Sequence, residues 1–387
     1  MLYLGIDADQ LAQLGGLHTA KEIEQQPHLW LQILEQFERE LPALRRFWES
    51  SIPRTKKIIL TGAGTSAFIG LNLRGCFQQM TGIPTEAVAT TDIVSHPHHY
   101  FLPNEPLLLI SFARSGNSPE SAAAIALADD ICQQCHHLII TCNREGALVQ
   151  QAPRSTHLHF FLPPQANDIS LAMTSSYSGM LLTGLLFAHI NELSSTKTKV
   201  QKTAAYASRL INSYAALLKE TARLSFNRVV FLGAGPLAGT ATEASLKMLE
   251  LTDGKVVSRN DTYLGFRHGP KSIIDAQTLV VYFLSSANTH SRQYETDLVQ
   301  SIKKGTAPLL EIGVAETRQA SSLFTQQYFF NDEASVGDEN FLALPYIIVA
   351  QLLGFYKSLQ LHLKPDSPSV NNDITRVVEG VTIYNRV

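Results

Sequence analysis

Short apolar runs alternate along the chain with stretches in which apolar residues recur every three to four positions. In the first half the runs are Ile58–Thr61, Leu107–Ser111 and Leu138–Thr141. In the second half they are Arg228–Leu232, Leu279–Leu284 and Ala343–Ala350, of which the last is equally compatible with a helix. Apolar runs of this length, separated by helical patterns, are typical of parallel sheets covered by helices on both faces. The pattern therefore predicts an α/β fold.

Two helices are predicted outside the sheets. One lies within the first 45 residues, where apolar side chains recur at a spacing of four: Leu29, Ile33, Phe37 and Leu41. This spacing is typical of an amphipathic helix packed against the first sheet. The other covers the stretch from Glu192 to about Leu224, which is rich in Lys, Ser and Thr and has a helical period. We expect it to join the two halves.

The two halves resemble each other. Residues 58–66 read IILTGAGTS and residues 229–237 read VVFLGAGPL, 171 positions later. An offset of about one domain length indicates two copies of a whole domain rather than a solenoid repeat. The sequence thus predicts two tandem doubly wound parallel-sheet domains with flanking helices. The expected boundaries are a helical segment at 1–44, a first domain at 45–200, and a second domain with a C-terminal tail at 201–387.

Composition excludes several classes of protein. Of 387 residues, 45% are hydrophobic and 17% are charged, with a net charge of −3. The chain thus has no excess of basic residues, and we expect neither a nucleic-acid nor a membrane partner. The longest mostly apolar stretch, Phe341–Tyr356, is 16 residues long and contains Pro345, short of the roughly 20 residues that cross a bilayer. The N-terminus lacks the basic region of a signal peptide. We therefore expect a cytoplasmic protein.

A glycine-rich turn follows the first predicted strand and opens a helical stretch: Gly62-Ala63-Gly64-Thr65-Ser66-Ala67. It fits a relaxed dinucleotide fingerprint, so a nicotinamide or flavin enzyme is one interpretation. That interpretation requires an acidic residue at the end of the second strand, whereas Glu86 begins its apolar run. Thr65 and Ser66, beside Gly64, favour an anion instead, because the helix N-terminus attracts one.

Two further loops carry hydroxyl groups. They are Arg114-Ser115-Gly116-Asn117-Ser118 and Thr174-Ser175-Ser176. Any one of these loops is explained by ordinary N-capping of a helix. Three of them at predicted carboxyl ends of strands should converge on one crevice of an open parallel sheet. A terminal phosphate, with a charge of roughly −1.5 to −2 near neutral pH, suits such a crevice.

These loops resemble the SIS (sugar isomerase) family, in which two flavodoxin-like domains are fused. The family's phosphate loop, S-x-S-G-x-[ST], appears here as residues 113–118, with Ala113 in place of the first serine. The missing contact is either absent or supplied by Ser111 or Arg114. The C-G-T-S turn of the isomerase half of glucosamine-6-phosphate synthase appears as residues 63–66. From about residue 45 onward, the chain resembles the branch of galactosamine-6-phosphate deaminases and tagatose-6-phosphate ketose/aldose isomerases.

Acidic and basic residues cluster in the second half. Glu243, Lys247 and Glu250 fall within an arc of about 60° around a helix, which by itself is also compatible with a solvated stripe. The segment is similar to the synthase pattern E-G-A-L-K-L-K-E, which is followed by G-E-L-K-H-G-P. The resemblance implies that Glu250 is the enolisation base, that Lys247 stabilises the enolate or keeps Glu250 ionised, and that His268 opens the sugar ring. It also implies that His268 reaches the other subunit of a homodimer.

Other residues are weighed against this pattern. In the tail, Arg376 stands nearest to the place of a synthase lysine, and arginine cannot form a Schiff base. Potential metal ligands occur in the run Cys132-Gln133-Gln134-Cys135-His136-His137 and among the three histidines of residues 96–99. No second CxxC exists, so we expect neither a metal nor a cofactor.

The resemblance implies an enzyme that acts on a hexose 6-phosphate. We expect it to convert galactosamine 6-phosphate to tagatose 6-phosphate and ammonia in N-acetylgalactosamine catabolism, because the chain carries no glutaminase half to supply ammonia for synthesis. Isomerisation of a non-amino hexose 6-phosphate uses the same residues and stays open. A sugar-phosphate sensor is a third interpretation, but it predicts loss of Glu250 and His268. Because residues 233–236 lack hydroxyl groups, we expect one sugar-phosphate site per subunit.

Overall fold

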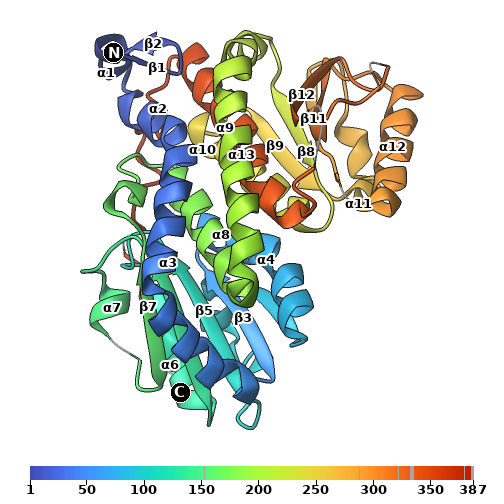
Figure 1. Ribbon diagram of the computed structural model, residues 1–387. Helices are drawn as coiled ribbons and strands as arrows, with labels where there is room; N and C mark the ends of the chain where they lie inside the picture. The colour runs from blue at the N-terminus through green and yellow to red at the C-terminus, as the bar shows by residue number, and fades with distance from the viewer. Residues whose placement is uncertain (152, 287, 321, 332–334, 379, 385–387) are drawn as a thin grey trace. The chain divides into compact units, whose positions relative to one another are not determined.

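The computed structural model describes residues 1–387 except 152, 287, 321, 332–334, 379 and 385–387. The described chain forms two compact units, each built on a five-stranded parallel sheet (Figure 1). The first-sheet unit comprises residues 29–168, 175–197 and 374–387. The second-sheet unit comprises residues 1–28, 169–174 and 198–373. The α/β architecture expected from the sequence is confirmed.

The strands of the first sheet contain the apolar runs of the first half. In spatial order they are β4 (Thr85–Ala89), β3 (Lys57–Gly62), β5 (Leu107–Ala113), β6 (Cys135–Thr141) and β7 (Thr156–Phe161). Every neighbouring pair is parallel. All seven residues of β5 are buried, as a central strand covered on both faces requires. The three strands predicted for this half lie within β3, β5 and β6.

Helices cover both faces of the first sheet. They are α3 (Gln26–Ser51), α4 (Thr65–Thr81), α5 (Thr90–Ser95), α6 (Pro119–Ile131), α7 (Ala147–Gln150) and α8 (Ser175–Ala188), with 3₁₀ turns η1 (Ile52–Arg54), η2 (Pro97–His99), η3 (Pro164–Ala166) and η4 (Ile190–Glu192). The amphipathic helix predicted from the spacing of four is α3. Its Phe37 ring lies 5.1 Å from Phe187 of α8 and 5.8 Å from Phe160 of β7, between centroids.

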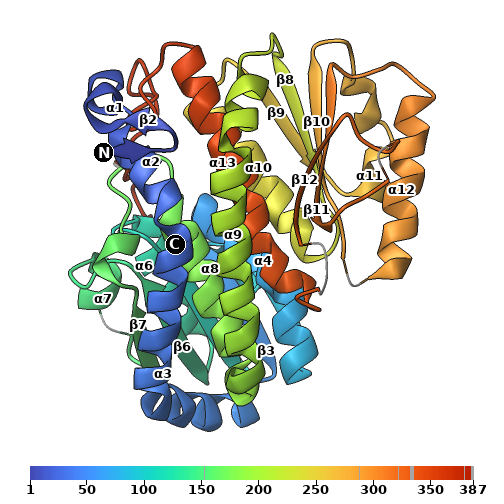
Figure 2. The ribbon, with the colours of Figure 1, turned by 45° about the horizontal axis from the view of Figure 1, so that its top comes forward.

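The second sheet repeats the strand order of the first. In spatial order its strands are β9 (Val257–Asp261), β8 (Arg228–Leu232), β10 (Thr278–Phe283), β11 (Leu310–Thr317) and β12 (Gln326–Asn331). Counted from its own first strand, each sheet therefore has the order 2-1-3-4-5, the doubly wound topology of flavodoxin-like folds. Figure 2 shows this sheet from yellow-green β8 to orange β12, with α12 beside it.

The helices of the second-sheet unit come from both ends of the chain. They are α1 (Ala8–Leu14), α2 (Leu17–Glu24), α10 (Pro236–Leu251), α11 (Tyr263–Phe266), α12 (Thr289–Lys303) and α13 (Glu339–Gln360), with η5 (Pro270–Ile273) and the short antiparallel pair β1 (Leu2–Tyr3) and β2 (Ile6–Asp7). The predicted connecting helix is α9 (Leu193–Ala222), which confirms the reading of the polar stretch.

The run Ala343–Ala350 belongs to α13, not to a strand. Its apolar pattern continues for 22 residues, too long for a strand of ordinary length, and the Asp338 side chain caps the helix by accepting from the Asn340 N–H at 3.1 Å. Among the described residues α13 is the one helix long and apolar enough to cross a membrane, but 94% of its apolar window is buried within the protein. It is a core helix.

The compact units are discontinuous in sequence, unlike the boundaries expected at 44 and 200. Residues 1–28 pack in the second-sheet unit, where the Thr19 hydroxyl donates to Asp366 at 2.7 Å and Tyr356 donates to the Leu4 carbonyl at 2.9 Å. Residues 374–387 belong to the first-sheet unit instead of the second. The boundaries differ because both chain ends are placed by long-range hydrogen bonds, which no local pattern encodes.

Candidate active site

The turn between β3 and α4 sets the predicted phosphate-binding residues at a helix N-terminus. Gly64 has a φ of 56°, which allows the chain to turn directly into α4. Thr65 and Ser66 are buried in the first turn of this 17-residue helix. A Cβ at Gly62 would lie 2.6 Å from the Ser66 Cβ, so only glycine permits the close return of the chain. The turn thus places two hydroxyl groups where the helix dipole favours an anion.

Gly62→Ala is expected to destabilise the fold by about 1–3 kcal/mol, because overpacking must displace Ser66. The same displacement should raise the KM for a phosphorylated substrate. Gly75→Ala is the matched control, since it lies in α4 with open space around an added Cβ and should be neutral or stabilising by up to about 1 kcal/mol. Urea unfolding and steady-state kinetics measure both quantities. An unchanged unfolding midpoint in Gly62→Ala would contradict the close approach.

The loop between β5 and α6 is braced by the loop that follows β6. The Asn117 side-chain oxygen accepts from the Ala147 N–H at 3.0 Å, and Asn143 donates to the Ser115 carbonyl at 2.8 Å. The Ser115 hydroxyl accepts from the Asn117 N–H at 3.3 Å, whereas the Ser118 hydroxyl donates to Glu120 at 2.5 Å. Of the two serines, Ser115 is therefore the better placed to donate a hydrogen bond to a ligand. Asn117 instead holds the loop in place through its bond to Ala147.

Two buried hydroxyl groups lie just upstream of these turns. Thr61 of β3 and Ser111 of β5 are register partners, and neither hydroxyl has a hydrogen-bond partner among the described residues. The sequence left Ser111 and Arg114 as alternatives to the serine that Ala113 replaces. Arg114 donates instead to the carbonyl of Arg376, which favours Ser111. Thr61 was not predicted, although its place beside Gly62 at the end of a strand was a usable signal.

The third hydroxyl loop has a different local role. Ser175 and Ser176 both donate their hydroxyl protons to Asp168, the latter at 2.5 Å, and Asp168 also accepts from the Ser176 N–H at 2.9 Å. Asp168 thus caps the N-terminus of α8, whereas ordinary capping would use a Ser or Thr hydroxyl of the loop as the acceptor. Thr174 belongs to the second-sheet unit, where its carbonyl accepts from Gln351 at 3.5 Å. Because both hydroxyl groups donate to Asp168, Ser175 and Ser176 do not donate hydrogen bonds to a phosphate in this arrangement.

Arg376 anchors the C-terminal tail to the first-sheet unit. Its Nε donates to the Asp168 carbonyl at 2.8 Å, and its Nη2 donates to the Asn167 side chain at 2.8 Å. Its own carbonyl accepts from Arg114 of the predicted phosphate loop. The arginine that stands near the place of the synthase lysine is thus bonded to residues 167–168.

Residues Glu243, Lys247 and Glu250 form the predicted cluster on α10. The Lys247 ammonium is fully buried, lies 3.2 Å from Glu243 Oε1 and is also bonded to Glu250 Oε2. Burial opposes the charge, but the two carboxylates outweigh it and raise the pKa of Lys247. Glu243 is fully buried as well, whereas the Glu250 side chain is 19% exposed. The buried ion pairs thus present one solvent-accessible carboxylate, that of Glu250.

The burial of this cluster depends on the close packing of α13 on α10. A Cβ at Gly354 would lie 2.8 Å from Leu251 Cδ1 and 3.5 Å from the Lys247 carbonyl. A larger residue here would require the Leu251 side chain to move. The solvated-stripe alternative for the three residues is wrong for Glu243 and Lys247, because both side chains are fully buried.

His268 lies at the surface of the second-sheet unit. It follows α11, and its N–H donates to the Gly265 carbonyl at 2.9 Å. The next residue, Gly269, has a φ of 120° that only glycine adopts readily. The exposed Leu264 lies on the same short helix. The structure thus gives His268 a defined backbone and an accessible ring.

Comparison with known proteins identifies the family. The SIS domain model matches residues 51–190. Over 383 residues, the chain is 40% identical to D-galactosamine-6-phosphate deaminase AgaS of Shewanella sp. strain ANA-3, covering 98% of this chain and 95% of that protein. The chain belongs to the AgaS family of SIS proteins. This confirms the family resemblance read from the loops.

Solved structures agree with the AgaS assignment. A Clostridium novyi NT protein assigned as a tagatose-6-phosphate ketose/aldose isomerase superposes with a TM-score of 0.96 at 39% identity, covering 100% of both chains. The tagatose-6-phosphate ketose/aldose isomerase of Escherichia coli superposes with a TM-score of 0.86 at 34% identity, covering 97% of this chain and 98% of that one. Two tandem SIS domains are therefore the fold of this AgaS-family chain.

In the loop that follows β10 of the second sheet, backbone N–H groups donate hydrogen bonds to carboxylates of the same chain. In this AgaS-family chain, Glu339 accepts from the Ser286 and Asn288 N–H groups, each at 3.0 Å. Glu295 accepts from the Ser285 hydroxyl at 2.6 Å and from the Ser285 N–H at 3.0 Å. Backbone N–H groups in such loops are what bind phosphate in other sheets. Here an internal carboxylate already occupies them.

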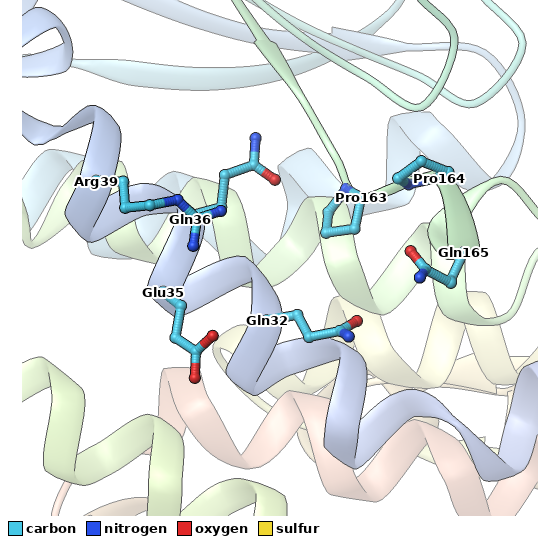
Figure 3. A pocket seen from close by; sticks show the side chains of 7 residues that line it. All are labelled: Gln32, Glu35, Gln36, Arg39, Pro163, Pro164 and Gln165. Atoms are coloured by element: carbon cyan, nitrogen blue, oxygen red, sulfur yellow. The ribbon is translucent and has the colours of Figure 1, made fainter.

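A polar pocket lies elsewhere in the first-sheet unit. It is lined by Gln32, Glu35, Gln36, Arg39 and residues 163–165. Figure 3 shows Gln32 of α3 directed toward Gln165, whereas Glu35 points away from it. None of the residues predicted for the AgaS active site lines this pocket, so it is not part of the candidate active site.

Proposed function

We propose that this AgaS-family chain is a D-galactosamine-6-phosphate deaminase, which converts D-galactosamine 6-phosphate and water to D-tagatose 6-phosphate and ammonia. The observation that carries the proposal is the cluster on α10, where buried Lys247 bonds the partly exposed carboxylate of Glu250. The name of the Shewanella relative supports the substrate. The acidic net charge of the chain agrees with a cytoplasmic metabolic enzyme, which we place in N-acetylgalactosamine catabolism.

The reaction needs one base that reaches two neighbouring carbons. In the open-chain sugar, Glu250 removes the C2 proton and the C2–H electrons form a C1–C2 double bond. The electrons of the C1 carbonyl bond move to O1, which takes a proton from water, and the product is an enolamine. The same carboxyl group then delivers a proton to C1, and the nitrogen remains on C2 as an imine. Water adds to C2, the C–N bond breaks, and ammonia leaves a C2 ketone. Lys247, whose ammonium bonds the Glu250 carboxylate, keeps that carboxylate ionised and therefore able to accept the C2 proton.

The sugar ring must open before enolisation. In the proposal His268 moves the proton between the ring oxygen and O1, a task that suits an imidazole near neutral pH. The 6-phosphate is held by Ser66, Ser115 and the N-terminus of α4. Glu339 and Glu295 fill the corresponding loop of the second sheet, so we infer one sugar-phosphate site per chain.

Incubation with D-galactosamine 6-phosphate tests the reaction. Ammonia is measured enzymatically and the ketose is identified by NMR, with Glu250→Gln as the control. Equal amounts of ammonia and tagatose 6-phosphate support the proposal. Ammonia no higher than in the Glu250→Gln control contradicts it. Interconversion of galactose 6-phosphate and tagatose 6-phosphate without a deaminase activity would favour plain isomerisation, the activity named for the two solved relatives.

Ser115→Ala is expected to raise the KM about tenfold or more, because it removes a hydrogen bond to a charged phosphate. Ser118→Ala is the matched control from the same loop, since its hydroxyl donates to Glu120, and its KM should stay within about twofold. The measurement is the initial rate over a range of substrate concentrations. Equal KM values for the two variants would remove Ser115 from the phosphate site.

Mixing two inactive variants tests whether His268 acts across a homodimer. In the proposal, each site takes Glu250 from one chain and His268 from its partner. Glu250→Gln and His268→Ala chains, exchanged at equal amounts, should therefore regain about a quarter of wild-type activity through heterodimers with one intact site. Subunit exchange is verified with a mass tag. Exchange without recovered activity would place both residues in a site within one chain.

A further inference from the structure

A cluster of potential metal ligands lies at the amino end of β6, away from the strand ends that carry the predicted phosphate loops. Asp129 of α6, Cys135 and His137 each place one ligand atom within 4.8 Å of the others. Cys135 and His137 are two residues apart on one strand, so their side chains project from the same face. Cys132, at the end of α6, belongs to the same buried core as Cys135.

Hydrogen bonds orient His137 within this cluster. Its Nε2 lies 3.0 Å from Asp129 Oδ1, while its Nδ1 is buried and has no partner among the described residues. The His137 side chain is 0% exposed and that of Asp129 is 3% exposed. Asp129 is itself held by the Ser155 hydroxyl at 2.5 Å and the Arg154 N–H at 2.8 Å. The imidazole and the carboxylate thus already lie side by side, as two ligands of one metal ion must.

We propose that this cluster binds one zinc ion, with Asp129, Cys135 and His137 as its protein ligands. Thiolate, imidazole and carboxylate are the donors that zinc prefers. Tetrahedral zinc places such atoms about 3.5 Å from one another, a separation that ligand atoms already within 4.8 Å of one another reach by small side-chain movements. The coordinating thiol releases its proton to solvent, and the dication offsets the buried negative charge that results.

The sequence argued against a metal because no second CxxC exists. The fold supplies the other two ligands instead: Asp129 from the preceding helix turn and His137 from the following strand. The role is structural and does not depend on the proposed function.

Cobalt binding to the purified full chain tests the zinc site. With one equivalent of Co²⁺ under reducing conditions, we expect thiolate-to-cobalt absorption near 300–350 nm that Zn²⁺ abolishes at a one-to-one ratio. The same band should be lost in Cys135→Ser and in His137→Gln, whose amide can still donate to Asp129. Wild-type protein that binds neither ion would overturn the proposal without recourse to any variant.

Two controls separate this site from other ligands in the chain. Cys76→Ser removes a buried cysteine of α4 outside the cluster and should leave the cobalt band unchanged. His99→Ala removes a surface ring that stacks on His96 at 5.0 Å between centroids and should also leave it unchanged. Metal binding that survives in Cys135→Ser but disappears in His99→Ala would assign the ion to the surface histidines and overturn the proposal.

Discussion

Glu250→Gln is expected to lower kcat by about 10³-fold while leaving the KM for galactosamine 6-phosphate nearly unchanged. The amide keeps the size of the side chain but cannot accept the C2 proton, and a positioned general base contributes about 10²–10⁴-fold. Because Glu250 is partly exposed at the end of α10, the substitution should alter the fold little. Initial rates from the coupled ammonia assay measure both constants.

The matched control for this variant is Glu220→Gln. Glu220 also bonds a neighbouring cation on a helix, the Arg223 guanidinium at 2.8 Å, but both side chains are more than 60% exposed. Its kcat should equal that of the wild type, because exposed pairs contribute little. A Glu250→Gln enzyme with more than about a tenth of wild-type kcat would show that another group removes the C2 proton.

Lys247→Met is expected to lower the free energy of unfolding by about 3–5 kcal/mol. The ammonium is the cation between two carboxylates, and removal of one member of a buried ion pair leaves an uncompensated charge. Glu243 bears most of this cost because it is fully buried, whereas Glu250 retains access to water. Urea unfolding, followed by circular dichroism, measures the loss.

A double variant separates charge from packing in this region. Glu243→Gln combined with Lys247→Met removes both buried charges and should recover most of the lost stability, since apolar or neutral replacements of a buried pair are often tolerated. If the double variant is as unstable as Lys247→Met alone, the loss comes from the packing of α13 on α10 and the electrostatic account of the cluster is wrong.

Local patterns predicted most of the buried strands and the long helices, but they missed the buried strand β11. The runs in β3, β5, β6, β8 and β10 are nearly continuous and apolar, as strands covered on both faces must be. Edge strands β7 and β9 were missed because their exposed positions carry polar residues, such as His157 and Arg259. The ambiguity at Ala343–Ala350 arose because a fully buried helix has no polar face to reveal its period.

The candidate site shows the same division. The spacing of Glu243, Lys247 and Glu250 encodes a contact within one helix, so the sequence was sufficient to predict it. Contacts between distant segments were not predictable: Asp168 accepts the Ser175 and Ser176 protons, and Arg114 bonds the tail at Arg376. The sequence of a hydroxyl-rich loop does not indicate whether its hydroxyl groups donate hydrogen bonds to a phosphate or to a buried carboxylate.

The most direct measurement of the central claim follows the substrate protons by NMR in D₂O. The account holds that Glu250 carries a proton from C2 to C1 of a sugar gripped by its 6-phosphate. The wild-type enzyme should therefore place solvent deuterium on C1 of tagatose 6-phosphate, while Glu250→Gln still binds the sugar but exchanges nothing. Undiminished transfer of hydrogen or solvent deuterium to C1 in Glu250→Gln would contradict the account.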